Sequence, residues 1–81
     1  MKPGDLVCLS DHVTELFPGV TLWETEYLWG KDVTYWESPG VGILLGFGSP
    51  YAHQGELQTG LVLTSTGHVG WTETKNIEGV S

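Results

Sequence analysis

The chain has 81 residues, 40% of them apolar, with ten acidic residues against three lysines and no arginine. This length fits one domain covering residues 1–81. The net charge of −7 disfavours nucleic acid as a partner, because phosphate backbones are bound chiefly by Lys and Arg. No stretch reaches the roughly 20 apolar residues of a membrane span, and no basic start followed by an apolar run indicates a signal peptide, so we expect no membrane partner. The single cysteine, Cys8, excludes an intrachain disulfide and fits a small buried apolar residue.

The N-terminal segment predicts a short strand followed by one helical turn. A Pro-Gly-Asp turn at residues 3–5 leads into four apolar residues, 6–9, which are typical of a strand with at least one buried face. Residues 10–17 can form one turn of helix, and Pro18-Gly19 ends it.

Residues 20–37 hold five of the nine aromatic residues and four of the ten acids. A turn at Gly30-Lys31 would have glycine first, as a type II′ turn requires, and would set Thr25 opposite Trp36. We therefore predict a hairpin here, with an irregular loop wrapped on the core as the alternative. One face of the hairpin would carry four aromatic residues: Trp23, Tyr27, Trp29 and Trp36.

The middle of the chain predicts two strands joined by a polar loop. The apolar run at residues 41–47 is typical of a strand, and its glycines suit a strand that curls strongly, as in a small barrel. A polar loop at residues 49–56 follows, and residues 57–64 form the next strand.

A hairpin joins residues 57–64 to residues 68–71. Glycine enters the left-handed region without a Cβ clash, so Gly67 suits the last position of a three-residue loop. That loop pairs Leu63 with Val69 and Leu61 with Trp71. Because side chains alternate along a strand, these four apolar residues share one face, which we predict to be core.

The chain ends in a short turn at residues 72–75, of 3₁₀ type, and a last strand at residues 76–80. Five short strands with frequent turns predict a small all-β barrel. The strands are expected at residues 6–9, 41–47, 57–64, 68–71 and 76–80. The expected core residues are Leu6 or Val7, Ile43, Leu45, Leu61, Leu63, Val69, Trp71 and Ile77.

Three framework stretches resemble small SH3-like proteins of tailed bacteriophages, cyanophages in particular. They are Gly4-Asp5-Leu6-Val7, Gly40-Val41-Gly42-Ile43-Leu44 and Gly67-His68-Val69-Gly70-Trp71. The resemblance covers most of residues 3–9 and 40–80. It implies a five-stranded SH3-like barrel with a long first, RT-like loop or hairpin at about residues 10–39. It also implies a virion structural protein, made in the bacterial cytoplasm and located in the phage particle, with capsid cement protein, head-to-tail connector and tail accessory protein as its open roles.

No constellation in the sequence indicates catalysis. The three histidines (His12, His53 and His68) fall on separate loops without metal-ligand spacing. Glu24 and Glu26 share the polar face of an alternating strand, and no glycine-rich loop precedes a helix. We therefore expect no enzyme activity, cofactor, metal or small-molecule substrate.

The surplus aromatic residues point instead to a protein partner, because Trp and Tyr are enriched at interface hot spots. The candidate partner-binding residues are Trp23, Tyr27, Trp29, Trp36, Glu24 and Glu26. The expected partner is a virion protein such as the major capsid protein, with many copies of the chain per particle. Alternatively, the segment folds back and buries two or three of the rings.

A second functional hypothesis is an SH3-type module that binds polyproline II peptides in an aromatic groove. Glu24, Glu26 and Trp36 would supply that groove. A nucleic-acid-binding barrel is disfavoured, since it would require arginines and a basic face.

Overall fold

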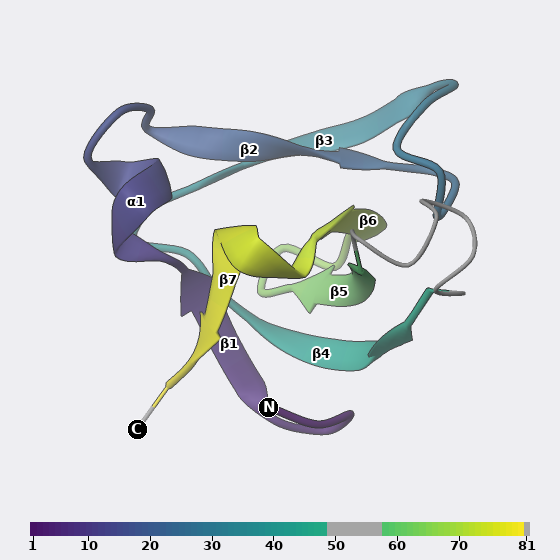
Figure 1. Ribbon diagram of the computed structural model, residues 1–81. Helices are drawn as coiled ribbons and strands as arrows, with labels where there is room; N and C mark the ends of the chain where they lie inside the picture. The colour runs from purple at the N-terminus through teal and green to yellow at the C-terminus, as the bar shows by residue number, and fades with distance from the viewer. Residues whose placement is uncertain (49–57, 81) are drawn as a thin grey trace.

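Among the residues that the structure describes, seven antiparallel strands form one sheet in the order β3-β2-β6-β5-β4-β1-β7 (Figure 1). The computed structural model describes residues 1–48 and 58–80. The strands are β1 (Leu6–Leu9), β2 (Gly19–Trp23), β3 (Asp32–Glu37), β4 (Val41–Phe47), β5 (Thr59–Thr64), β6 (Val69–Glu73) and β7 (Ile77–Gly79). The all-β class is confirmed. The five expected strands correspond to β1, β4, β5, β6 and β7, while the polar loop expected at residues 49–56 lies outside the described residues.

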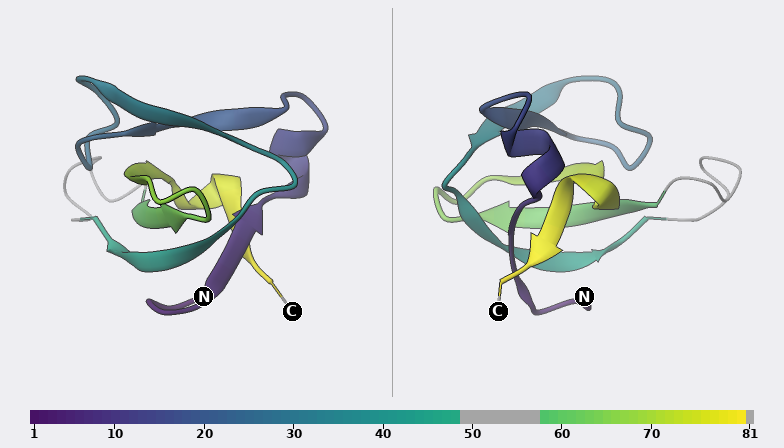
Figure 2. Two further views of the ribbon diagram at one scale, coloured as in Figure 1. Left: turned by 180° about the vertical axis from the view of Figure 1, so that it is seen from behind. Right: turned by 60° about the vertical axis from the view of Figure 1, so that its left-hand side comes forward.

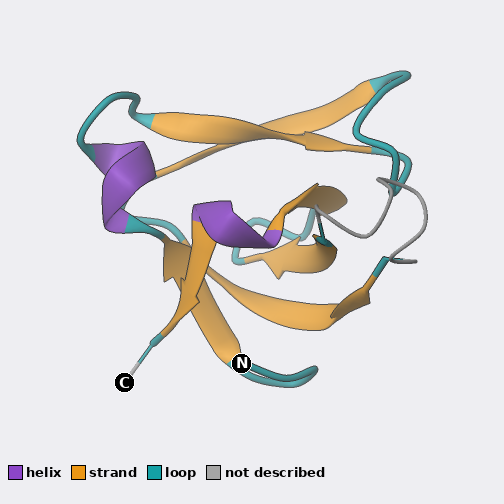
Figure 3. Ribbon diagram, in the orientation of Figure 1, coloured by secondary structure: helices purple, strands orange, loops and turns teal. Residues whose placement is uncertain are grey.

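The long first segment contributes the two further strands, β2 and β3, so the hairpin alternative is the correct one. Within the described part of the chain, two short helical turns lie at strand ends: α1 (Asp11–Thr14) before β2, and the 3₁₀ turn η2 (Thr74–Asn76) before β7 (Figure 3). The sheet is strongly curled. Figure 2 shows β2 and β3 passing over the β5–β6 hairpin, with β4 and β1 on its other side.

The core lies inside this curl and is small. Its buried apolar residues are Val7, Leu9, Val13, Leu22, Trp36, Leu44, Val62 and Ile77. Val7 and Ile77 were expected there. The expectation is wrong for the other positions: Ile43, Leu45 and Val69 are exposed, and Leu61, Leu63 and Trp71 are only half-buried.

The β5–β6 hairpin has the predicted register, but the face that packs against the core is the opposite of the predicted one. Leu63 pairs with Val69 and Leu61 with Trp71, and Gly67 has φ +90°, as predicted. The face turned to the core is the other one. It carries Gly60, Val62, Thr64, Gly70 and Thr72, all buried.

Close approach between strands explains why the smaller residues face inward. A Cβ on Gly70 would lie 2.6 Å from Cβ of Leu22. A Cβ on Gly42 would lie 2.7 Å from Cγ1 of Val62. The inside of a tightly curled sheet has less room than its outside, so glycine and threonine fit there, and Leu22 and Trp36 from the β2–β3 hairpin fill the remaining space.

The β2–β3 hairpin has a different register from the predicted one. Trp36 pairs with Val20 rather than Thr25, and the ladder ends at Trp23 opposite Asp32, after an irregularity between Leu22 and Trp23. Leu22 and Trp36 are both core residues, so burial sets the pairing, and residues 24–31 are left as a loop.

Candidate functional site

The connection between β2 and β3, residues 24–31, is an ordered loop that we call the aromatic loop. Backbone N–H of Glu24 donates to the carbonyl of Lys31 (3.2 Å), and N–H of Lys31 donates to Oε1 of Glu24 (3.2 Å). Within the loop, the hydroxyl of Thr25 donates to the carbonyl of Trp29 (3.0 Å), and N–H of Leu28 donates to the carbonyl of Thr25 (3.1 Å). These bonds hold the loop in one shape without using its aromatic rings.

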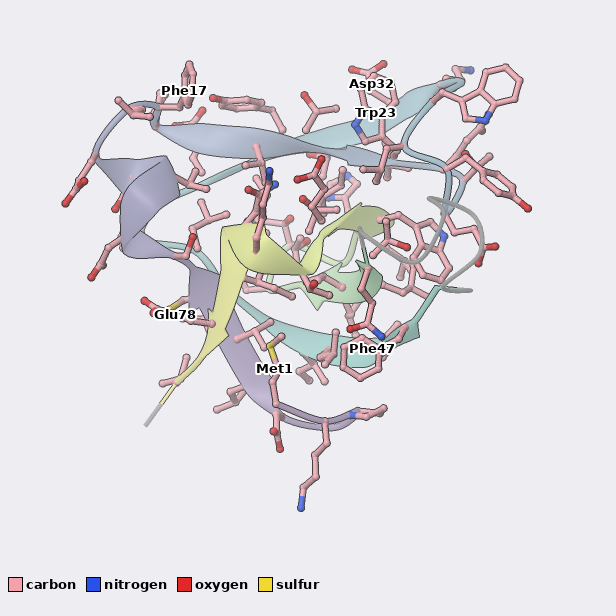
Figure 4. All side chains as sticks on the ribbon, in the orientation of Figure 1. Met1, Phe17, Trp23, Asp32, Phe47 and Glu78 are labelled. Carbon is pink, nitrogen blue, oxygen red and sulfur yellow. The ribbon has the colours of Figure 1, made fainter. Side chains whose placement is uncertain are left out.

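Two of the predicted aromatic residues are presented to solvent by this loop. Trp29 is 66% exposed and Tyr27 is 45% exposed. Trp23 is half-buried at the end of β2, where it lies opposite Trp71 of β6. Figure 4 labels Trp23 beside Asp32, at the base of the loop and at the opposite end of the hairpin from Phe17. These three predicted aromatic residues therefore lie together at one end of the hairpin.

Trp36 is not part of this surface, and its expected role in partner binding is wrong. It is 5% exposed and belongs to the core. Its ring packs against Gly40 and lies 3.5 Å from where a Cβ on Gly42 would be. Among the described residues, its Nε1–H has no hydrogen-bond partner. Trp36 is thus a packing residue, and the groove that required it in the peptide-binding hypothesis must be built from other residues.

The backbone of the aromatic loop is strained at one position. Leu28 has φ +60°, a left-handed conformation that costs a residue with a Cβ roughly 1–2 kcal/mol. Gly30 has φ +92°, which glycine adopts without that cost. Non-glycine residues held in this region cluster at binding and active sites, and Leu28 lies beside the cleft described next.

A cleft of about 320 Å³ runs between the β2–β3 hairpin and the β6–η2 segment. We call it the aromatic cleft and define it by Trp23, Leu28, Tyr35 and Glu73, which line it. Glu73 Oε2 lies 3.1 Å from Nζ of Lys75. Sequence reasoning did not single out Tyr35 as a site residue, although its alternation with the buried Trp36 would have placed it on the outer surface of β3.

The two glutamates expected in the site have different surroundings. Glu24 is exposed, and its carboxylate closes the loop by accepting from Lys31. Glu26 is half-buried and points toward the end of β4, with its Cβ 3.3 Å from where a Cβ on Gly48 would lie. With Asp32 beside the loop, residues 24–32 carry three acids and one lysine, so the local charge is negative.

Two further titratable side chains, His68 and Cys8, lie outside the residues that form the aromatic loop and the aromatic cleft. His68 belongs to the β5–β6 turn, where its Nδ1 lies 3.0 Å from the hydroxyl of Thr66. Partial burial, followed by the negative charges of Glu78 and Asp11, raises the pKa of the Cys8 thiol.

Within residues 1–48 and 58–80, no group of three or more His, Cys, Asp or Glu residues could hold a metal ion. In the described part of the chain, no helix is long and apolar enough to cross a membrane.

No family model, curated protein or solved structure matches this chain. The candidate site therefore rests on its own geometry: two exposed rings on an ordered acidic loop, next to a cleft walled by Trp23, Leu28 and Tyr35.

Proposed function

We propose that the chain is a non-enzymatic structural protein of a bacteriophage particle, most specifically a capsid cement protein that binds the shell through the aromatic loop. The observation that carries this proposal is the exposure of Trp29 and Tyr27 on a loop fixed by its own hydrogen bonds. A pre-ordered loop loses little conformational entropy on binding, which leaves more of the contact energy as affinity.

The charge of the loop fits a basic partner surface. Glu24 and Asp32 are exposed beside the rings, and the whole chain carries −7. Lys and Arg on the partner would be attracted to this end, which speeds association and fixes orientation more than it adds affinity. The rings would supply most of the binding energy, since Trp and Tyr dominate interface hot spots.

The finer fold assignment is part of the same proposal. We infer an SH3-like barrel, in which β1, β4, β5, β6 and β7 are the five barrel strands and residues 10–39 are the long first loop. Support comes from the order of the elements, including the 3₁₀ turn η2 directly before the last strand, and from the framework motifs that resemble phage proteins.

Incorporation into particles tests the cement role. In the phage that encodes the chain, Tyr27→Ala with Trp29→Ala should lower the amount of protein in purified particles about tenfold or more, as expected for loss of two hot-spot rings. Phe17→Ala is the matched control, since Phe17 is also aromatic and 61% exposed but lies at the other end of the hairpin. Normal incorporation of the double variant, with its melting curve unchanged, would refute the role of the loop.

Copy number separates the virion roles. Hundreds of copies per particle, counted by quantitative mass spectrometry, support the cement role, whereas a dozen or fewer support a head-to-tail connector or tail accessory protein.

The aromatic cleft favours a second candidate, an SH3-type peptide-binding module. Trp23, Leu28 and Tyr35 would contact a polyproline II segment, and Glu73 would meet a basic residue beside it. Titration with a proline-rich peptide carrying flanking arginines should then shift amide signals around the cleft, and Tyr35→Ala should abolish those shifts. Absence of binding at millimolar peptide would eliminate this candidate.

A further inference from the structure

The outer surface of the sheet, turned away from the core, is apolar across strands β1, β4, β5 and β6. One row of directly paired residues crosses all four strands: Leu6, Ile43, Leu63 and Val69. A second row continues from β5 to β6: Leu61 and Trp71. We call this surface the outer face. It exists because the side of β4, β5 and β6 that carries glycine and threonine is the one that packs inward.

The outer face leaves large aliphatic side chains in water. The exposed fractions are 52% for Leu6, 40% for Val41, 37% for Ile43, 42% for Leu45 and 42% for Val69. A shallow hollow of about 200 Å³ lies within it, lined in part by Leu6, Ile43 and Leu63. Contiguous apolar patches of this kind are rare on monomeric proteins and usually mark interaction sites.

The charge distribution indicates what covers this face. The two central strands, β4 and β5, contain no charged residue, although the chain carries −7. Three acids of the described residues, Asp5, Glu73 and Glu78, stand at the margins, on or next to β1, β6 and β7. A basic partner would be selected by acids within the contact, as around the aromatic loop. An uncharged centre instead fits another uncharged surface, and it keeps the acids of two identical copies apart.

The size of the face is sufficient for a weak self-contact. At the usual strand spacing and rise, four strands of about five residues cover a footprint of about 19 by 17 Å. Each footprint is roughly 320 Å², so two such faces packed together bury on the order of 650–1,000 Å² with side-chain relief and the margins included, the size of a weak or transient contact.

We propose that the outer face is the interface of a homodimer, in which a second copy of this chain packs its own outer face against the first about a twofold axis. Such a contact is isologous, so the same rows of residues meet from both sides. The proposal does not rest on the virion role, because it concerns a different surface from the aromatic loop and the cleft. It implies a reversible dimer rather than an obligate one.

Sedimentation velocity of the purified chain tests this directly. From about 5 to about 500 µM, the weight-average sedimentation coefficient should rise from the monomer to the dimer value, as for a micromolar equilibrium. Raising NaCl from about 20 to about 500 mM should strengthen the association, because salt screens the repulsion between two chains of −7. Binding of the aromatic loop to a basic partner should weaken with salt, so the two proposals fail independently.

Two variants locate the interface. Ile43→Thr with Val69→Thr keeps β-branched side chains in the strands but adds two hydroxyls to the outer face, and should leave the chain monomeric throughout the concentration series. Val33→Thr is the matched control, since Val33 is 36% exposed on β3, outside the outer face, and should dimerise as the unmodified chain does. A monomeric unmodified chain at the highest concentration, or equal dimerisation of both variants, would overturn the proposal.

A measurement on the unmodified chain covers the case in which the double variant does not fold. Amide signals in ¹⁵N-labelled protein should shift with concentration, and the shifts should be confined to β1, β4, β5 and β6. Shifts centred on residues 24–31 instead would place the self-contact on the aromatic loop and contradict the proposal.

Discussion

Leu44 and Leu45 are neighbours in β4 with opposite surroundings: Leu44 is 0% exposed in the core, whereas Leu45 is 42% exposed on the outer face. The same substitution at the two positions therefore isolates the effect of burial. Leu44→Ala should lower the free energy of unfolding by about 2–5 kcal/mol, the usual cost of a buried Leu→Ala change, and Leu45→Ala by less than half as much. Urea unfolding of both variants measures the difference. Equal losses would mean that Leu44 and Leu45 are buried to the same extent, which would contradict the structure.

The approach of Gly70 to Leu22 gives a second prediction. A Cβ at position 70 would lie 2.6 Å from Cβ of Leu22, too close without movement of β2 or β6. Gly70→Ala should therefore destabilise the chain by about 1–3 kcal/mol, the cost of overpacking a core. Gly79→Ala is the control, because a Cβ there meets no atom within 4 Å. A shared small effect in thermal melts would argue against close packing at Gly70.

The turn of the β5–β6 hairpin gives a third prediction, which depends on backbone conformation alone. Gly67 has φ +90°, and a Cβ there would meet nothing within 4 Å. Gly67→Val should cost roughly 1–2 kcal/mol or more, because β-branched residues are strained at positive φ. Gly67→Asn should cost less, since Asn tolerates left-handed conformations better. If the two variants melt at the same temperature, the turn does not require a positive φ.

Local signals in the sequence were sufficient to predict most secondary-structure elements and much of the strand pairing. Turn chemistry at Gly67 correctly predicts the register of Leu63 with Val69, because a three-residue loop leaves one way to pair the strands. The choice of inward face could not be predicted in this way. It depends on how tightly the whole sheet curls, and the more apolar side of β4, β5 and β6 is the outer one here.

The candidate site was predictable to a similar extent. The aromatic and acidic composition of residues 20–37 correctly indicated exposed rings at Tyr27 and Trp29. The assignment of Trp36 failed because its hairpin register is set by burial against the core, a contact between segments that no local pattern records. Tyr35 and Glu73 meet in the aromatic cleft only through the pairing of β2 with β6, which is likewise invisible in the sequence.

The thiol of Cys8 gives a prediction on pH. Its pKa is raised above the ordinary value of 9.0, first by partial burial and then by the charges of Glu78 and Asp11. The folded chain therefore holds the thiol proton to higher pH than the unfolded chain does. The contribution of the Cys8 thiol to the free energy of unfolding is therefore constant below pH 9.0, and it becomes destabilising as the pH rises above that value. The pH midpoint of alkylation by iodoacetamide should be higher for the native chain than for the same chain in urea. Coincident midpoints would contradict the raised pKa.

Leu28 gives the last prediction, because it combines strain with a place in the aromatic cleft. Its φ of +60° is costly for leucine, and its side chain lines the cleft beside Trp23 and Tyr35. Leu28→Asn removes part of the strain, since Asn enters the left-handed region more readily, but also removes apolar contact in a half-buried position. These two effects offset each other to within about 1 kcal/mol, so the melting temperature should change little. Binding through the cleft should nevertheless fall, because the apolar wall is lost. In a peptide titration with the unmodified chain as reference, a variant that binds equally well would show that Leu28 serves only the shape of the loop. A variant that melts much lower would show that the packing of the Leu28 side chain stabilises the fold by more than the strain costs, so that no ligand is needed to explain the conformation.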